Sequence, residues 1–359
     1  MTKLLALYLP QFHQIPENDV WWGEGFTEWN VVKKATSLNK HSSQPKIPLM
    51  GYYDLSKKES IKQQVELANN YGIDGFVIYS YYSNGKTLLE TPSRIILDNT
   101  DINISFCFSW ANHDWLRTWF SYNRELLRKQ EYASDRKQIA AHFEYYLPYF
   151  KDDRYIKIDN KPVLFIYDYE SIPDFSLYRM VFNQLAIENG FDGVFFVQTL
   201  GGHHLSRNPA LFEAFFEYEP TYTTFSDMKN VHRLHRLKRA IKKVFKGHYL
   251  TNIFKYDDVC TRMEKRPCDP FTICGSFAEW DNTPRHNHNG TVFSGFSIAR
   301  FKKNLLIQLN KAKKSNSPFV VIDAWNEWGE GAFLEPDVKY SFQKLEAIRS
   351  VVNECDYNN

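Results

Sequence analysis

The chain has 359 residues, of which 43% are hydrophobic and 24% are charged, and its formal net charge is +2. That length supports one large core, or two to three ordinary domains. The nearly balanced charge excludes a chain-wide positive field of the kind that attracts nucleic acid.

Aromatic residues make up 16% of the chain, with 22 Tyr, 28 Phe and 9 Trp. Aromatic rings can stack on the apolar faces of sugars, and they can equally fill a large core. Composition alone does not separate these two interpretations.

The five cysteines are scattered, odd in number and free of CxxC spacing, which is typical of reduced thiols in a cytoplasmic protein. The first ten residues are too short and wrongly flanked for a signal peptide. No stretch approaches the roughly 20 apolar residues of a membrane span. We therefore expect a cytoplasmic protein, with peripheral attachment to the inner membrane as an open alternative.

Short apolar runs rich in Val, Ile, Phe and Tyr recur along the chain at residues 4–9, 75–79, 102–108, 162–167, 193–198, 211–217, 271–277 and 318–324. Continuous rather than alternating apolarity favours strands buried on both faces of a parallel sheet. Helical patterns lie between many of them, most clearly at residues 56–71, 175–189 and 298–314.

Eight strands with interspersed helices predict an α/β fold, a TIM-like (β/α)8 barrel that occupies residues 1–359 as a single catalytic domain. A doubly wound sheet is the alternative. Two connections, residues 11–48 and 219–270, are too long for tight barrel loops and are expected to cover or flank a site. We interpret residues 219–270 as an insertion.

Carboxylates, amides and aromatic rings follow nearly every apolar run, where the strands of a barrel would present functional groups. Such a set suits a carbohydrate site, because Asp, Glu, Asn and His can bond to hydroxyls while Trp and Tyr can stack on sugar rings. The predicted substrate-binding residues are Tyr8, Gln11, His13, Trp29, Trp110, Asn112, Tyr167, Tyr218, Trp280, Asp281, Trp325 and Asn326.

The stretch DAWNEWGEGAFLEPD, residues 323–337, places two acids three residues apart among tryptophans and glycines. Glycosidic cleavage commonly uses two carboxyl groups, one protonated and one ionised, so Glu327 and Glu330 are the predicted catalytic pair. Trp325 or Trp328 could raise the pKa of one glutamate and keep it an acid. The alternative is that Glu330 belongs to a solvated loop and Glu327 pairs with an arginine.

Histidines at 203–204, 286 and 288 lack the spacing of a zinc site, so no metal or cofactor is predicted. His13 is a better candidate for the pocket wall than for a metal ligand.

Residues 229–246, KNVHRLHRLKRAIKKVFK, carry eight Lys and Arg and no acid, and apolar residues recur among them at helical spacing. We interpret this segment as a helix with its apolar stripe packed on the barrel and its basic side solvated. Peripheral contact with an anionic membrane is the alternative, and it would favour a lipid-linked glycan as substrate.

Long stretches of the chain resemble the WbsX-like family of bacterial surface-polysaccharide gene clusters, which is related to glycoside hydrolase family 99. The resemblance is carried by ALYLPQFHQIPENDVWWGEGFTEWNVVKKA, QPKIPLMGYYDL, YGIDGFVIYSYYSNGK, YFKDDRYIKIDNKPVLFIYD, EWDNTPR and WNEWGEGAFLEPD. It covers most of the chain from Leu4 to about Asp337 and is weakest over residues 200–270. It implies a (β/α)8 barrel.

The resemblance also implies roles for the two acids, because Glu327-Trp-Gly-Glu330 matches the Glu-Trp-x-Glu pattern of family 99. Glu330 would protonate the leaving oxygen, and Glu327 would take a proton from the sugar's own 2-hydroxyl. That oxygen would attack the anomeric carbon and give a 1,2-anhydro sugar, which suits 1,2-trans linkages such as α-mannosides. His113 and Asp114 depart from the family's usual Glu-Asn at this point.

We therefore expect a retaining, endo-acting glycoside hydrolase that acts on an O-antigen or capsule type polysaccharide or its lipid-linked precursor. A glycosyltransferase or transglycosylase of lipopolysaccharide or capsule biosynthesis is the first alternative, although the chain has no Asp-x-Asp, GxGxxG or P-loop motif. A glycan-binding barrel without catalytic activity is the second alternative. The expected partner is an oligo- or polysaccharide, not a nucleic acid.

Overall fold

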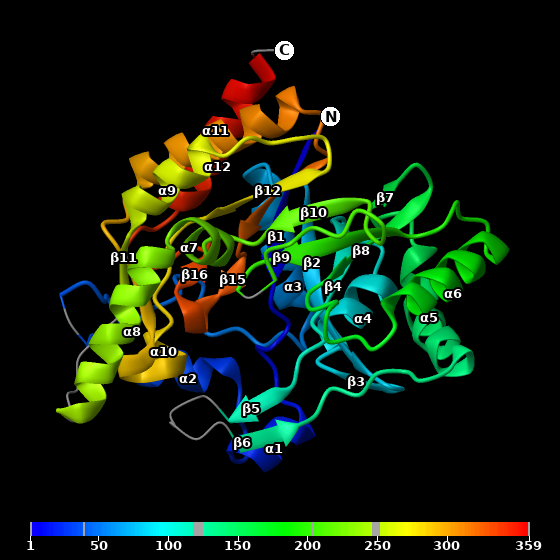
Figure 1. The fold of residues 1–359 in the computed structure, drawn as a ribbon, viewed down its shortest axis with the longest axis horizontal. Helices are drawn as coiled ribbons and strands as arrows, with labels where there is room; N and C mark the ends of the chain where they lie inside the picture. Colours follow the sequence, from blue (N-terminus) through cyan, green and yellow to red (C-terminus); the bar gives the residue numbers. More distant parts are fainter. Residues whose placement is uncertain (1, 39, 118–124, 203, 246–251, 358–359) are drawn as a thin grey trace.

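The computed structural model describes residues 2–38, 40–117, 125–202, 204–245 and 252–357, so that His203 and Lys246 lie outside the described residues. Eight parallel strands form a closed barrel, because β1 pairs with both β2 and β14 (Figure 1). In barrel order the strands are β1 (Lys3–Tyr8), β2 (Gly75–Ser83), β4 (Ser105–Trp110), β8 (Lys161–Ile166), β9 (Phe195–Leu200), β10 (Ala214–Glu217), β12 (Thr272–Phe277) and β14 (Phe319–Asp323).

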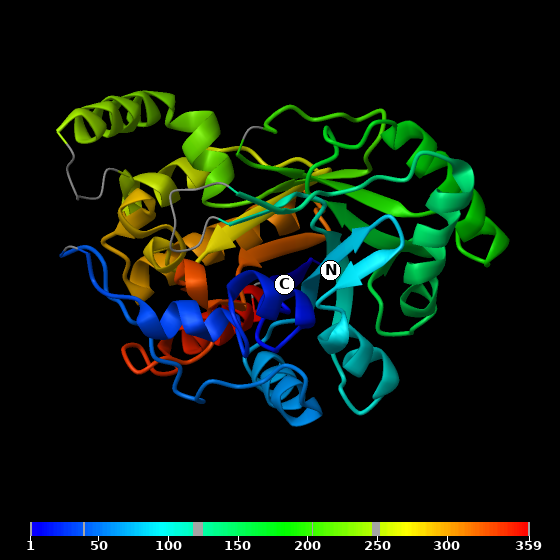
Figure 2. The same ribbon diagram turned by 90° about the horizontal axis from the view of Figure 1, so that it is seen from below.

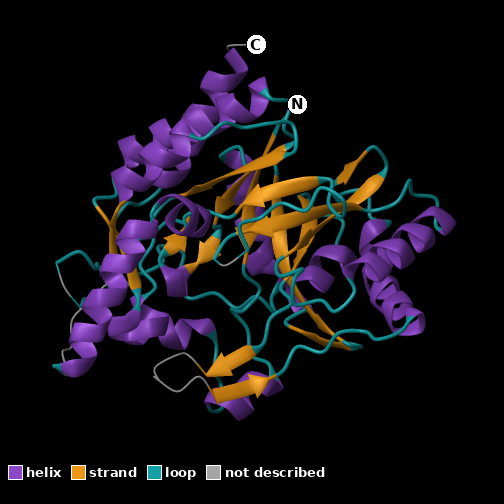
Figure 3. Ribbon diagram, viewed as in Figure 1, coloured by secondary structure: helices purple, strands orange, loops and turns teal. Residues whose placement is uncertain are grey.

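All eight predicted apolar runs coincide with these strands, which confirms the barrel and excludes the doubly wound sheet. The strands are almost entirely buried, as continuous apolarity requires. Helices surround the sheet (Figure 3). They are α3 (Lys58–Asn70), α4 (Thr91–Asp98), α5 (Arg136–Phe150), α6 (Phe175–Glu188), α9 (Tyr256–Lys265), α11 (Ile298–Lys314) and α12 (Gln343–Tyr357).

Shorter elements decorate the barrel, and most gather at the carboxyl ends of the strands, away from the two termini (Figure 1). They are α1 (Pro16–Trp22), α2 (Glu28–Lys34), β3 (Lys86–Leu88), β5 (Trp115–Arg117), β6 (Glu125–Arg128), β7 (Lys157–Ile158), α10 (Thr283–His286), η1 (Asn287–Asn289), β15 (Asn326–Glu327), η2 (Trp328–Glu330) and β16 (Ala332–Phe333).

The long connection between β10 and β12 carries α7 (Thr221–Asp227), α8 (Lys229–Val244), β11 (Asn252–Lys255) and α9. β11 pairs in parallel with β13 (Thr291–Ser294), which belongs to the next connection. Together they enclose a second, smaller apolar cluster that includes Met228, Phe254, Trp280 and Phe293.

α8 lies at the periphery of the molecule (Figure 2) with its apolar stripe outward, so the interpretation that this stripe packs on the barrel is wrong. Leu237 is 58% exposed and Val244 is 75% exposed, whereas His235 is 3% exposed and Lys242 is 8% exposed. The Lys242 ammonium donates to the carbonyl of His288 at 2.7 Å. None of the described helices has the length and apolarity to cross a bilayer.

Candidate active site

Arg285 of α10 lies at the carboxyl end of the barrel and binds three carboxylates at once. Its Nε donates to Glu28 Oε1 at 2.8 Å, its Nη2 to Glu327 Oε2 at 2.7 Å, and its Nη1 lies 2.8 Å from Glu330 Oε1. The Glu28 side chain is fully buried, Glu327 is 6% exposed and Glu330 is 15% exposed. Three carboxyl groups therefore meet one cation, largely out of water.

Three separate connections deliver these side chains. Glu28 begins α2 after β1, Arg285 follows β12, and Glu327 and Glu330 follow β14 in a tight turn formed by β15 and η2. The Asp281 N–H donates to the Glu330 carbonyl at 2.7 Å and fastens the β12 connection to this turn. The predicted pair is thus positioned by backbone bonds as well as by Arg285.

Gly329 allows the close approach of Glu28 to the turn. A Cβ at this position would collide with Glu28 Oε1 and would come within 2.8 Å of Arg285 Nε. The next glycine, Gly331, has φ +63°, the left-handed conformation that ends η2. The two glycines of the motif therefore serve geometry, one by its lack of a side chain and one by its backbone.

Burial raises the pKa of Glu327 to about 8, and the neighbouring Glu330 and Glu28 charges add to this effect while Arg285 opposes it. Burial also raises the pKa of Glu28 against the pull of Arg285. Behind the pair, fully buried Asp323 has a pKa well above its usual range because of burial and the Glu330 and Glu327 charges. The site can therefore retain a proton at neutral pH.

Tyrosines form one wall beside the carboxylates. Burial is the main cause that raises the pKa of Tyr79, Tyr167 and Tyr218, and the charge of Asp323 acts on all three. The Tyr167 and Tyr218 rings are 6.1 Å apart and line a cavity of about 180 Å³ with Thr199, Gly201, Gly202, His204 and Thr221. This wall offers hydroxyl groups and ring faces together.

A second aromatic group continues this wall. Tyr81 accepts a hydrogen bond from Gln11 Nε2 at 3.1 Å, and its ring lies 5.1 Å from Trp115. His113 lies 5.6 Å from the Tyr167 ring. His113, which departs from the family pattern, therefore adjoins the aromatic wall. Asp114, the second such position, accepts a hydrogen bond from the Gln130 N–H at 2.7 Å.

Glu335 organises a polar network under the pair. It accepts hydrogen bonds from Trp328 Nε1 at 2.6 Å, Tyr53 Oη at 2.8 Å and Gln64 Nε2 at 2.7 Å. Tyr8 joins the same network by donating to Gln64 Oε1 at 2.7 Å. Burial raises the pKa of Glu335 to about 7. Tyr8 thus lies in the supporting layer.

Several other predicted residues have their polar atoms engaged by the fold. Asn326 exchanges two bonds with the Leu9 backbone, and Asn112 does the same with Asp168. Side-chain hydrogen bonds likewise hold Trp29 (to the Tyr53 carbonyl), Trp110 (to the Tyr82 carbonyl) and Asp281 (to Ser42 and Thr283). Trp325 is held by its ring contact with Phe76. Their assignment as sugar contacts stays a prediction.

The structure distributes the remaining predicted residues around the site. Gln11, Tyr167 and Tyr218 lie on the aromatic wall, whereas Trp280 lines a different pocket with the basic helix. His13 is 2% exposed, and burial lowers its pKa. No three His, Cys, Asp or Glu side chains of the described residues converge as metal ligands.

Sequence reasoning missed Arg285, Glu28 and Asp323. The first two lie within stretches that carry the family resemblance, and Asp323 ends a predicted strand. Two buried glutamates require a cation, but this requirement does not indicate which residue supplies it. The alternative in which Glu327 pairs with an arginine describes the observed contact, but Glu330 is held by the same arginine and is not in a solvated loop.

Comparisons with solved structures agree with the fold. A GH99 endo-alpha-mannosidase from Bacteroides thetaiotaomicron superposes with a TM-score of 0.60 at 14% sequence identity, covering 99% of this chain and 98% of that chain. A structure described as a glycoside hydrolase-like protein gives a TM-score of 0.58 at 13% identity, covering 98% of this chain and 93% of that chain. At these identities the similarity is one of fold.

Sequence comparison identifies the family. The protein WxcX of Xanthomonas campestris pv. campestris strain B100, described as uncharacterized, is 31% identical over 360 residues, which cover 99% of this chain. The chain spans about half the length of that relative. The family model described as Glycosyltransferase WbsX matches residues 4–348. The chain therefore belongs to the WbsX glycosyltransferase family.

Proposed function

We propose that the protein is a glycan-active enzyme that cleaves its substrate with retention and in endo fashion, with Glu327 and Glu330 as its catalytic pair. The observation that carries the proposal is the binding of both carboxylates to one arginine at the carboxyl end of the barrel, with the pKa of Glu327 raised to about 8. Such a cluster places a proton donor and a proton acceptor side by side.

In the proposed reaction Glu330 gives its proton to the glycosidic oxygen, which leaves with the aglycone. Glu327 accepts the proton of the sugar's 2-hydroxyl, whose oxygen bonds to the anomeric carbon and forms a 1,2-anhydro sugar. Water then attacks the anomeric carbon and gives a proton to Glu330, while the C1–O2 bond breaks and Glu327 returns its proton to O2, so that both acids are restored and the anomeric configuration is retained. Glu330 is the more exposed of the two acids, which suits the group that exchanges protons with water.

The substrate that we propose is a bacterial surface polysaccharide of O-antigen or capsule type, or its lipid-linked precursor, with a 1,2-trans linkage like that of α-mannosides. The fold shared with a GH99 endo-alpha-mannosidase and the WbsX family membership support this class. Attack by a 2-hydroxyl requires it to lie trans to the leaving group, which is the stereochemical reason for this choice.

Transfer is the second candidate, and the family's description as a glycosyltransferase favours it. The same anhydro sugar opened by a sugar hydroxyl would give transglycosylation with the same two glutamates. Product analysis separates the two outcomes, because hydrolysis releases a new reducing end and transfer lengthens an acceptor.

We also propose that the protein works at the cytoplasmic face of the inner membrane. The exposed apolar stripe of α8 and the basic residues around it support peripheral contact with an anionic bilayer. This would bring the barrel to a lipid-linked glycan.

Replacing the acid tests the proposal. Glu330→Gln should lower kcat on oligosaccharides from the source organism's surface polysaccharide by roughly 10²–10⁴-fold, the usual contribution of general acid catalysis. Glycan binding should persist, because the amide keeps the shape of the side chain. Glu66→Gln, on the exposed face of α3, is the matched control and should leave kcat unchanged. Full activity of the Glu330 variant would remove the residue from the mechanism.

A further inference from the structure

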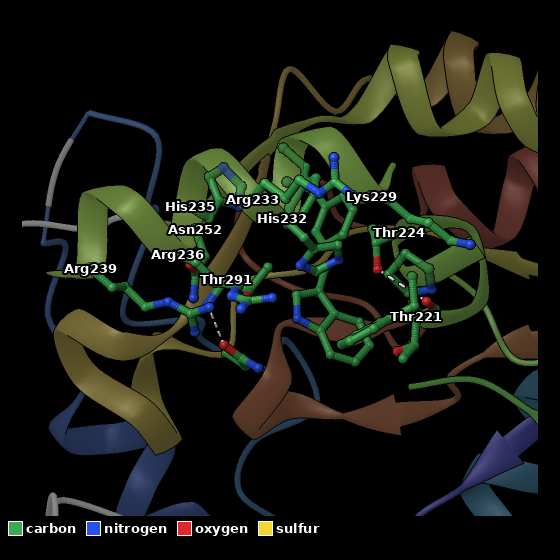
Figure 4. A pocket seen from close by; sticks show the side chains of 16 residues that line it. Thr221, Thr224, Lys229, His232, Arg233, His235, Arg236, Arg239, Asn252 and Thr291 are labelled. Atoms are coloured by element: carbon green, nitrogen blue, oxygen red, sulfur yellow. Dashed lines mark hydrogen bonds between the residues drawn. The ribbon is translucent and has the colours of Figure 1, made fainter. Parts of the chain in front are cut away.

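A second, larger pocket lies beside the barrel mouth, between α7, α8 and the β11–β13 sheet (Figure 4). Its cavity volume is about 700 Å³. Figure 4 shows Arg239 at one end, Thr221 and Thr224 at the other, and His232 between them. Its lining includes Lys229, Arg233, Arg236 and Trp280.

The pocket carries an uncompensated positive charge. Arg233, Arg236 and Arg239 stand three residues apart on α8, and the helix contains no acid. Within the described part of the chain none of these three arginines forms an ion pair. Asp227, the acid just before the helix, is bound to Arg266 at 2.6 Å. Arginines that have no ion-pair partner among the described residues and line a cavity are suited to bidentate binding of an anion.

Two histidines of the pocket each have a buried ring nitrogen without a hydrogen-bond partner among the described residues. His235 is 3% exposed, and its Nδ1 has no hydrogen-bond partner among the described residues. Burial and the nearby cations Lys238 and Arg239 lower the pKa of His235 to about 4. His232 Nε2 is likewise without a partner there. Buried polar atoms of this kind are expected to meet a ligand or water.

The pocket adjoins the catalytic edge. Trp280 and Asn282 line it, and the residue between them, Asp281, donates its N–H to the Glu330 carbonyl. Thr221 lines both this pocket and the cavity formed by Tyr167 and Tyr218. A ligand in the basic pocket would therefore lie next to a sugar held at Glu330.

The face of α8 opposite the pocket is apolar and exposed, which indicates an apolar part of the ligand. Leu234, Leu237, Ile241 and Val244 form the exposed stripe, and at 100° per residue they lie on the other side of the helix from His232, His235 and Arg239. One helix thus presents cations to the pocket and apolar side chains to the exterior. A phosphorylated lipid has the complementary chemistry.

We propose that this pocket binds the diphosphate of a lipid-linked glycan. The inference rests on the proposed function and adds the site that holds the carrier end of the substrate. The cavity exceeds what a single phosphate fills, and its three arginines match the many oxygens of a diphosphate. Trp280 stands between the diphosphate and the catalytic glutamates, where the first sugar would stack.

Calorimetric titration of the whole chain tests the pocket without requiring turnover. The probes are inorganic pyrophosphate, farnesyl diphosphate below its micellar concentration, uridine diphosphate and glucuronate. We expect both pyrophosphate and farnesyl diphosphate to bind. Arg233→Gln/Arg236→Gln should weaken them at least about tenfold, because each charged hydrogen bond contributes a factor of this order. Lys238→Gln/Lys243→Gln removes the same charge from exposed positions outside the pocket lining and should change affinity less than about twofold.

Equal weakening in the control variant would reveal a nonspecific charge effect and overturn the site. Uridine diphosphate binding more than tenfold tighter than pyrophosphate would identify a nucleotide pocket instead, and preferred binding of glucuronate would identify an acidic-sugar site. Thermal melting verifies that each variant is folded. Glu330→Gln should bind pyrophosphate like the native protein, so loss of the catalytic proposal and loss of the diphosphate site give different results.

Discussion

Arg285 faces three carboxyl groups, and this imbalance determines how Glu327 and Glu330, the proposed catalytic pair, must titrate. One guanidinium cannot neutralise Glu28, Glu327 and Glu330 together in a buried place, so a proton held by one of them stabilises the cluster. Burial directs that proton to Glu327, whose pKa is raised to about 8. A general base in this position works only after it has lost the proton.

The pH dependence of kcat/KM follows from this. If Glu327 is the base, kcat/KM should rise about tenfold per pH unit as the pH increases toward about 8, because the base acts only in its ionised form. Initial rates between pH 5.5 and 9.5 would measure this limb. A fall in rate above pH 8, with no acidic limb near it, would reverse the roles of Glu327 and Glu330.

Thermal melting of Glu327→Gln provides an independent reading of the same group. A folded-state pKa raised above the unfolded value near 4.3 means that stability is lost as pH rises between those two values. The glutamine variant lacks this loss, so its Tm relative to the native protein should increase from pH 5 to pH 9. A difference that stays constant over this interval would contradict the raised pKa.

That Glu327 and Glu330 lie together could be predicted because both belong to one short motif. Their partners could not, since Arg285 lies 42 residues from Glu327 and 257 residues from Glu28 in the sequence. Only closure of the barrel brings β1, β12 and β14 connections to one point. Local sequence patterns therefore do not predict that these side chains meet.

The turn of β15 and η2 depends on the absence of a side chain at Gly329. Gly329→Ala should displace Glu28 or Arg285, reduce the free energy of unfolding by roughly 1–3 kcal/mol, and lower kcat by about 10²-fold. Denaturant unfolding and initial rates measure both effects. Because the collision is with Glu28, adding Glu28→Ala should cost less than the sum of the two single changes.

Glu66→Ala supplies the control for this cycle. Its side chain is exposed on α3, so its effect should simply add to that of Gly329→Ala. Additivity in the Glu28 cycle as well would mean that the turn accommodates the methyl group elsewhere.

In a flotation assay the protein should bind vesicles that contain anionic lipid, and the exposed apolar side chains of α8 should contribute to that binding. Leu237→Ser/Ile241→Ser should reduce the amount of bound protein about tenfold or more at low salt. The reason is that two aliphatic side chains that insert into the bilayer supply at least this much binding free energy. Met180→Ser/Ile187→Ser removes apolar groups of similar exposure from α6 and should have no effect. Absence of flotation for the native chain, or equal loss in both variants, would rule out this membrane contact.

Helical periodicity predicted α8 itself but assigned its apolar stripe to the wrong surroundings. A pattern of Leu and Ile identifies which face is apolar, and the usual occupant of that face is the core. Here the opposite face of α8 carries His232, His235 and Lys242, while the apolar stripe remains exposed. The periodicity of a helix shows that one face is apolar and the other is basic, but it does not show which face packs against the rest of the protein.

The complete barrel was the most predictable property of the molecule. Its eight strands are buried on both sides, so each produces an uninterrupted apolar run that single-sequence reading detects. The net charge of +2 was less informative, because it averages a basic pocket on α8 with an acid-rich site at the carboxyl end of the barrel. The total charge excludes a uniform positive field, but it does not reveal the local basic region or the local acidic region.

Pairing of β11 with β13 has a consequence for engineering. The two strands come from successive connections of the barrel, yet they share one ladder of hydrogen bonds at the edge of the basic pocket. Grafting either loop alone from another member of the family would leave a strand edge without its neighbour. The ligand specificity of the basic pocket should therefore be exchangeable between relatives only when both loops are transplanted together.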